Sequence, residues 1–166
     1  MFIIANSRFR DEELLIPKEI ISQSGATVSI ASSSLLTAKG VLGARIEPDL
    51  LIDKLNPKDF DAVIFVGGGG AREYYNSKEA HRVVNSTINE GKILGAICIA
   101  PVILANAGVL KNKKATVFPS EIDNIKKVNV IYTDANVVVD GNIITARGPE
   151  AAREFGEAIR DKLYDG

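Results

Sequence analysis

The sequence contains one cysteine, one histidine and no tryptophan among its 166 residues. A single cysteine excludes a disulfide within the chain, and one cysteine with one histidine does not supply the ligands of a zinc site. The formal net charge of −1 gives no indication of a nucleic-acid partner or of an anionic membrane surface. No apolar run approaches the roughly 20 residues that a helix needs to cross a bilayer. We therefore expect no metal, no nucleic acid and no membrane as partners.

The first residues also lack the pattern of a secretory signal. No charged segment precedes the short apolar run at residues 2–5, and Arg8 and Arg10 follow it closely. This run is typical of a buried first strand, and we expect a cytoplasmic protein. The chain has 46% apolar and 25% charged residues, which predicts one globular domain over residues 1–166 with a core that needs no disulfides.

Short apolar runs alternate with segments of helical periodicity along the chain. The runs expected as strands are 2–5, 27–31, 61–66, 93–97, 115–118 and 128–131, with a hairpin over 137–144 that turns at Asp140-Gly141. The segments expected as helices are 11–24, 77–90, 100–107 and 150–163, the first kinked or broken at Pro17. Residues 32–58 are expected to form a connection with a short hairpin. This alternation predicts an α/β fold with a mostly parallel sheet and helices on both faces.

Cys98 stands where a predicted strand, 93–97, meets a predicted helix. Small residues flank it, and Pro101 suits the first turn of a helix. This is the layout of a nucleophile elbow with cysteine as the nucleophile. The helix N-terminus is expected to lower the pKa of the thiol. A buried structural cysteine fits the local pattern equally well.

Four glycines, Gly67 to Gly70, directly follow the predicted strand 61–66. Their backbone N–H groups could approach a ligand closely, as in an oxyanion site or a phosphate cradle. The run matches neither the dinucleotide-binding motif nor the Walker A motif. Its spacing alone therefore favours a tight turn.

Two further features have ordinary explanations. The acidic run Asp11-Glu12-Glu13 opens a predicted helix, where carboxylates commonly stabilise the helix dipole and remain solvated. His81 lies among charged and polar residues of the predicted helix 77–90. This position is typical of a histidine at the surface rather than in a catalytic site.

Taken together, four stretches resemble the ThiJ/PfpI superfamily. In chain order they are residues 9–17, 63–68, 95–105 and 140–149. The elbow at 95–105 and the Arg-Gly-Pro segment at the end of 140–149 are specific, whereas the glycine stretch alone is weak. The superfamily includes intracellular protease I, protein deglycases, glyoxalase III enzymes and a parkinsonism-associated redox sensor. The resemblance implies a flavodoxin-like three-layer sandwich with a cysteine elbow and no cofactor.

The resemblance also implies roles for particular residues. It assigns Cys98 as the nucleophile and Glu13, four residues before Pro17, as the glutamate that hydrogen-bonds its sulfur. A carboxylate beside a thiolate raises one of the two pKa values, so we expect a coupled pair in which a protonated Glu13 faces the thiolate. The same arrangement would stabilise a sulfinic acid.

Four more positions match less central parts of the family pattern. Gly68 and Ile99 match the residues whose backbone N–H groups form an oxyanion pocket, and Gly67 adjoins them. Arg147 matches an arginine near the site or the dimer surface. The family commonly assembles, and we expect a homodimer or a higher homo-oligomer.

Histidine is missing at both family positions that carry it. Ile99 replaces the histidine of the protease-like branch, and Phe118, before Pro119, replaces that of the redox-sensing branch. A general base contributes about 10²- to 10⁴-fold to a rate, so peptide hydrolysis is disfavoured unless His81 of a neighbouring subunit supplies one. Attack of a thiolate on a reactive aldehyde needs less assistance.

The function expected from these features is action on reactive 2-oxoaldehydes or their adducts in stress protection, as in glyoxalase III enzymes and deglycases. The partner would be a small-molecule aldehyde or a glycated or peptidic substrate. Three alternatives remain open: a non-catalytic redox sensor that acts through oxidation of Cys98, an intracellular cysteine peptidase or amidase, and an inert structural relative.

Overall fold

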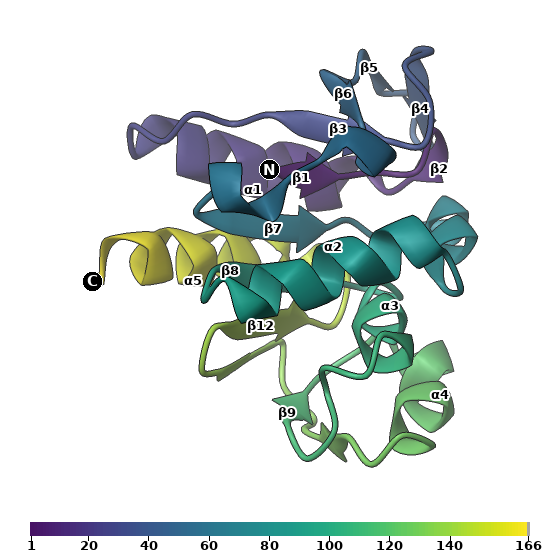
Figure 1. Cartoon of the computed structure of the whole chain (residues 1–166), viewed down its shortest axis with the longest axis vertical. Coiled ribbons are helices and arrows are strands. Elements are labelled where there is room, and N and C mark those ends of the chain that lie inside the picture. The colour runs from purple at the N-terminus through teal and green to yellow at the C-terminus, as the bar shows by residue number, and fades with distance from the viewer. Residues whose placement is uncertain (166) are drawn as a thin grey trace.

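The computed structural model describes residues 1–165 and is built around a seven-stranded sheet (Figure 1). In sheet order its strands are β11 (Val137–Asp140), β12 (Ile143–Ala146), β8 (Ile93–Ile97), β7 (Ala62–Phe65), β1 (Phe2–Ile3), β3 (Ile30–Ser32) and β6 (Leu50–Leu51). Every neighbouring pair is parallel except β11 with β12. The five inner strands follow the flavodoxin-like order, which confirms the predicted α/β class. The expected domain 1–166 includes Gly166, which lies outside the described residues.

Helices cover both faces of this sheet, as predicted (Figure 1). The longer ones are α1 (Asp11–Gln23), α2 (Lys78–Asn89), α3 (Pro101–Asn106) and α5 (Ala152–Tyr164), and α4 (Ile122–Lys126) is a single short turn. Side chains of a strand point alternately to the two faces, so Val63 packs in the cluster of α2 and α3, and Ile64 in that of α1 and α5. No helix within residues 1–165 has both the length and the apolar character needed to cross a membrane.

Two small sheets lie outside the main one. The first joins β2 (Ser7–Phe9), β4 (Ala38–Gly40) and β5 (Arg45–Ile46), so the hairpin expected within residues 32–58 is confirmed as β4–β5. The second pairs β9 (Lys114–Ala115) with β10 (Ile131–Tyr132). The strand expected at 128–131 is therefore wrong in position, because the turn after α4 occupies its first residues. The 3-10 helices are η1 (Ile52–Lys54), η2 (Pro57–Asp59), η3 (Gly69–Tyr74), η4 (Pro119–Glu121) and η5 (Pro149–Ala151).

Two local expectations need correction. Helix α1 continues through Pro17, where a kink or break was expected. Helix α5 packs so closely there that a Cβ on Gly156 would lie 2.8 Å from the Cα of Pro17. In the β11–β12 hairpin, Asp140 pairs with Ile143, so the two-residue turn is formed by Gly141 and Asn142 rather than by Asp140-Gly141.

Candidate active site

Cys98 occupies a strained turn between β8 and α3, as the elbow pattern predicted. Its φ of 65° lies in the left-handed region, which is unfavourable by about 1–2 kcal/mol for a residue with a Cβ. Two backbone hydrogen bonds hold it there: its N–H donates to the Ala146 carbonyl at 2.9 Å, and its own carbonyl accepts from the Phe118 N–H at 2.8 Å. The side chain is 7% exposed. Segments far apart in the chain therefore fix the orientation of the thiol.

The Glu13 carboxyl and the Cys98 side chain both lie against Gly67. A Cβ on Gly67 would lie 2.6 Å from the Cys98 Cβ and 2.8 Å from the Glu13 Oε1. Glu13 is 0% exposed, and within residues 1–165 neither of its oxygens has a nitrogen or oxygen hydrogen-bond partner. A carboxyl in such surroundings is strongly penalised when charged. The interpretation of Glu13 as a solvated helix-dipole residue is wrong.

The two other acids of this run have separate structural roles. Asp11 is buried, and its carboxylate accepts hydrogen bonds from the Leu42 N–H at 2.9 Å and the Ala44 N–H at 2.7 Å. Glu12 pairs with Arg10 at 2.7 Å near the surface. Asp11 thus ties the β4–β5 hairpin to the start of α1, a function that the sequence pattern did not reveal.

The glycine run closes the other side of the sulfur. Gly68 has a φ of 94°, and a Cβ there would lie 2.5 Å from the Arg8 carbonyl oxygen and from the Arg10 nitrogen. Only glycine fits this approach. The backbone N–H groups of Gly68 and Ile99 hydrogen-bond the Cys98 sulfur, which lowers the pKa of the thiol. The run therefore opens η3 and lines the site, and its interpretation as a simple tight turn is incomplete.

Burial outweighs these N–H groups in setting the protonation of the pair. It raises the pKa of the Glu13 carboxyl from 4.5 to about 8. Burial, followed by the charge on Glu13, raises the pKa of the Cys98 thiol to about 12. The expected lowering of the thiol pKa is wrong in direction, because burial and the neighbouring Glu13 outweigh the N–H groups that favour the thiolate.

The two groups titrate as one system. The first proton leaves the pair as the pH approaches the raised pKa of Glu13, about 8. In the resulting monoanion the remaining proton can sit on the carboxyl while the charge sits on the sulfur. This thiolate form is stabilised by the N–H groups of Gly68 and Ile99. Because the pKa of the thiol is raised further than that of the carboxyl, the main monoanion carries its charge on Glu13, and the thiolate facing a carboxylic acid is its minor tautomer.

A cavity of about 740 Å³ is lined by sequence neighbours and hydrogen-bond partners of this pair, although neither Cys98 nor Glu13 lines it. Arg147 contributes to its wall, where its guanidinium pairs with Asp134. Phe118 lies there too and is bonded through its N–H to the Cys98 carbonyl, and the cavity reaches Glu12, the neighbour of Glu13. The full lining is Arg10, Glu12, Phe118, Pro119, Asp134, Arg147, Gly148, Pro149 and Glu150.

His81, the only histidine in the sequence, is engaged elsewhere. It lies on α2, and its Nε2 is hydrogen-bonded to the Tyr75 carbonyl at 2.9 Å. The structure does not bring His81 to Cys98.

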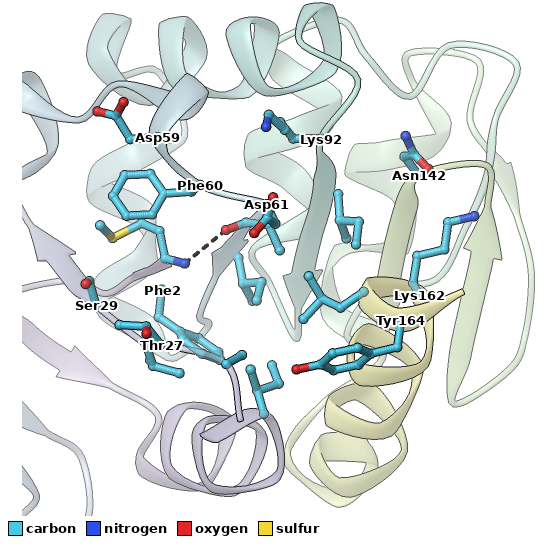
Figure 2. Close-up of a pocket in the computed structure, with 18 of the residues that line it drawn as sticks. Phe2, Thr27, Ser29, Asp59, Phe60, Asp61, Lys92, Asn142, Lys162 and Tyr164 are labelled. Atoms are coloured by element: carbon cyan, nitrogen blue, oxygen red, sulfur yellow. Dashed lines mark hydrogen bonds between the residues drawn. The ribbon is translucent and has the colours of Figure 1, made fainter. Parts of the chain in front are cut away.

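A second cavity, of about 840 Å³, lies at the amino ends of the central strands, and Figure 2 shows its lining residues. It is lined by the first residues of β1, β7 and β8, namely Phe2, Ala62 and Ile93. The Met1 amino group donates to the Ala62 carbonyl at 2.9 Å in its wall (Figure 2). Ligands of open α/β sheets bind at the carboxyl ends of the strands, and this cavity contains none of the predicted site residues. We therefore place the candidate active site at Cys98.

This fold and site define an α/β protein of the flavodoxin-like class with a buried cysteine at a strand-to-helix turn. The chain belongs to the DJ-1/PfpI family, whose sequence pattern matches residues 1–162. A crystal structure of a ThiJ/PfpI domain protein from Brachyspira murdochii superposes with a TM-score of 0.97 at 30% identity, covering 99% of this chain and 95% of that one. The resemblance inferred from the four sequence stretches is thus confirmed.

Two similar relatives are named as enzymes. A deglycase from Pyrococcus horikoshii is 37% identical over 149 residues, which cover 90% of this chain and 89% of the relative. A glutathione-independent glyoxalase from Caenorhabditis elegans is 29% identical over 151 residues, which cover 91% of this chain and 81% of the relative. These names support an enzymatic role in general.

Proposed function

We propose that this chain is a cofactor-independent enzyme that converts reactive 2-oxoaldehydes, or their adducts, to 2-hydroxy acids through Cys98 and Glu13. The observation that carries the proposal is the buried Glu13 carboxyl, which has no nitrogen or oxygen partner within residues 1–165 and faces the Cys98 side chain. A carboxyl left unpaired in the core destabilises the fold, so its retention indicates chemistry. The names of the deglycase and glyoxalase relatives support the same class of reaction.

The reaction needs no external oxidant. The Cys98 thiolate bonds to the aldehyde carbon, C1, and the Glu13 carboxyl gives its proton to the aldehyde oxygen, which yields a hemithioacetal. The Glu13 carboxylate then takes the hydrogen of C1 as a proton and returns it to C2, the former ketone carbon. The hydroxyl proton moves from the oxygen on C1 to that on C2. As a result C1 is oxidised, C2 is reduced, and a thioester forms.

Water completes the cycle. It hydrolyses the thioester, releases the 2-hydroxy acid and restores the Cys98 thiol. Negative charge develops on a substrate oxygen during both attack steps, and the N–H groups of Gly68 and Ile99 are the donors we assign to it. Arg147 and Gly67 have supporting roles: Arg147 shapes the cavity wall, and Gly67 leaves the space in which the pair meets.

The absence of a nearby histidine disfavours the peptidase alternative. With His81 bound to the Tyr75 carbonyl, no imidazole of the same chain protonates an amine leaving group. An aldehyde has no leaving group at the attack step, so Glu13 alone suffices. We further propose that the enzyme works in the cytoplasm as a homodimer or larger homo-oligomer, as the family resemblance implies.

Redox sensing is the second candidate, and one observation favours it. A protonated Glu13 beside the sulfur would hydrogen-bond a Cys98 sulfinate and slow its further oxidation to the sulfonate. Mild peroxide would then give a Cys98 sulfinate that persists in wild type and proceeds to sulfonate in Glu13→Ala. Mass spectrometry that finds Cys98 unmodified under these conditions would remove this candidate.

Lactate formation from methylglyoxal tests the enzymatic proposal. Pure protein without glutathione is expected to produce lactate, and Cys98→Ser is expected to produce none above the uncatalysed rate. Several 2-oxoaldehydes should be assayed, including glyoxal and phenylglyoxal. No turnover of any of them by folded wild-type protein would overturn the proposal.

A further inference from the structure

Two arginines that the proposed chemistry does not use converge beside the glycine run. A Cβ placed on Gly69 would lie 3.7 Å from Nη1 of Arg72 and 4.0 Å from Nη1 of Arg8. Arg8 comes from β2 and Arg72 from η3, so they reach this point from different parts of the chain. Both residues are exposed. Two guanidinium groups therefore flank one open position on the backbone.

Of the two charges, only that of Arg72 has a carboxylate partner among residues 1–165. Within residues 1–165, no carboxylate lies in ion-pair distance of Arg8. Arg72 has one partner, Glu121, at 3.4 Å. Glu121 also accepts hydrogen bonds from Tyr75 at 3.1 Å and from Asn124. Because like charges repel, two guanidinium groups at one point favour an anion between them.

Arg8 is also held in an unfavourable backbone conformation. Its φ is 59°, a region that costs a residue with a side chain about 1–2 kcal/mol. Strain of this kind persists where the surrounding structure enforces it and is frequent at ligand sites. At the same place, the missing side chain of Gly69 leaves free space in front of the two guanidinium groups.

The position adjoins the candidate active site. Gly69 follows Gly68, whose N–H group hydrogen-bonds the Cys98 sulfur, and consecutive Cα atoms are about 3.8 Å apart. The two arginines and the sulfur therefore flank the same short glycine segment. Guanidinium groups bind carboxylates and phosphates through paired, charge-assisted hydrogen bonds.

We propose that Arg8 and Arg72 form an anion subsite over Gly69, which binds a carboxylate or phosphate carried by the aldehyde substrate a few bonds from its carbonyl carbon. The assignment to a substrate rests on the proposed function, whereas the anion subsite itself does not. The preferred substrates are then anionic aldehydes, and neutral ones such as methylglyoxal react without this contact.

A pair of alkylating reagents tests the subsite without any turnover. Iodoacetate and iodoacetamide each form a bond from the Cys98 sulfur to carbon and release iodide, and they differ mainly in the charge of one end. Cys98 is the only cysteine, so mass spectrometry of the whole protein reports its alkylation directly. The quantity to compare is the ratio of the iodoacetate rate to the iodoacetamide rate at pH 8 and low salt.

The ratio is expected to fall roughly threefold or more in Arg8→Gln, because one positive charge near the sulfur is lost. Arg72→Gln should lower it similarly, and Arg72→Lys, which keeps the charge, should largely preserve it. The exposed Arg153 on α5 provides the matched control, since Arg153→Gln should leave the ratio unchanged. Salt at 0.5 M should bring wild type close to the Arg8→Gln value.

Two anions show whether the subsite prefers a phosphate or a carboxylate group. Inorganic phosphate and succinate are titrated as protectants of wild-type Cys98 against iodoacetamide, and the stronger protectant identifies phosphate or carboxylate as the preferred group. Both should protect the Arg8→Gln variant more weakly. An unchanged reagent ratio in Arg8→Gln, with equal protection of wild type and variant, would overturn the subsite. If the ratio falls in Arg8→Gln but the wild-type protein turns over no aldehyde, the anion subsite stands and its assignment to a substrate is rejected.

Discussion

Glu13 and Cys98 face one another across Gly67, with a hypothetical Gly67 Cβ lying 2.8 Å from the Glu13 Oε1 and 2.6 Å from the Cys98 Cβ. The two residues are brought together by the start of α1 and the end of β8, which lie 85 positions apart in the sequence. The missing side chain of Gly67 is what permits the contact. The pair therefore depends on three segments of the chain at once.

Gly67→Ala should separate the pair. The added methyl group would overlap both side chains, so we expect lactate formation to fall by at least an order of magnitude and the melting temperature to drop by several degrees. Full activity of Gly67→Ala with methylglyoxal would show that the contact between Glu13 and Cys98 is not needed.

The buried carboxyl should make stability fall as the pH rises. Between pH 4.5, the ordinary pKa of Glu13, and about 8, its raised value, the unfolded chain loses the proton while the folded chain keeps it. The native state then binds more protons than the unfolded state, so the free energy of unfolding decreases by up to about 1.4 kcal/mol per pH unit.

Glu13→Gln removes the titrating carboxyl, and with it this pH dependence, while it keeps the shape of the side chain. Urea unfolding at pH 5, 6.5 and 8 should show the variant gaining stability relative to wild type as the pH increases. A difference between the two proteins that does not change with pH would contradict the raised pKa of Glu13.

Alkylation of Cys98 should report the same titration from the side of the sulfur. The rate with iodoacetamide is expected to rise through pH 8 in wild type, because the reactive thiolate is a tautomer of the monoanion, and the monoanion forms only when the first proton has left the pair. In Glu13→Gln no step should occur near this pH, and alkylation should increase at higher pH only. A wild-type rate that stays flat from pH 7 to 9 would mean that the monoanion carries its charge on the carboxyl and leaves the sulfur protonated.

The sequence predicted the central sheet well because its strands are continuous apolar runs separated by helices with clear stop signals. It did not predict β2 or β6, since strands of three and two residues have no periodicity of their own and depend on distant partners. The shift of the strand expected at 128–131 has the same origin: β10 exists only where Lys114 and Ala115 can pair with it.

The proximity of Cys98 and Glu13 could be predicted from the sequence, whereas their electrostatics could not. The elbow pattern and the family resemblance together identified Cys98 and Glu13, which the structure brings together. The pKa of the thiol was predicted in the wrong direction because its burial depends on tertiary contacts, such as the bonds to Ala146 and Phe118. No local pattern indicated that Arg8 and Arg72 would meet over Gly69.

The central claim is that Glu13 moves the proton within an adduct on Cys98, and the rate of lactate formation by Glu13→Gln tests it most directly. The measurement uses saturating methylglyoxal without glutathione at pH 8, and alkylation of Cys98 at pH 9 verifies that the thiol of the variant is still accessible. We predict a loss of kcat of at least about 100-fold, the usual contribution of a general base. A variant that keeps kcat within a few-fold of wild type would contradict the account.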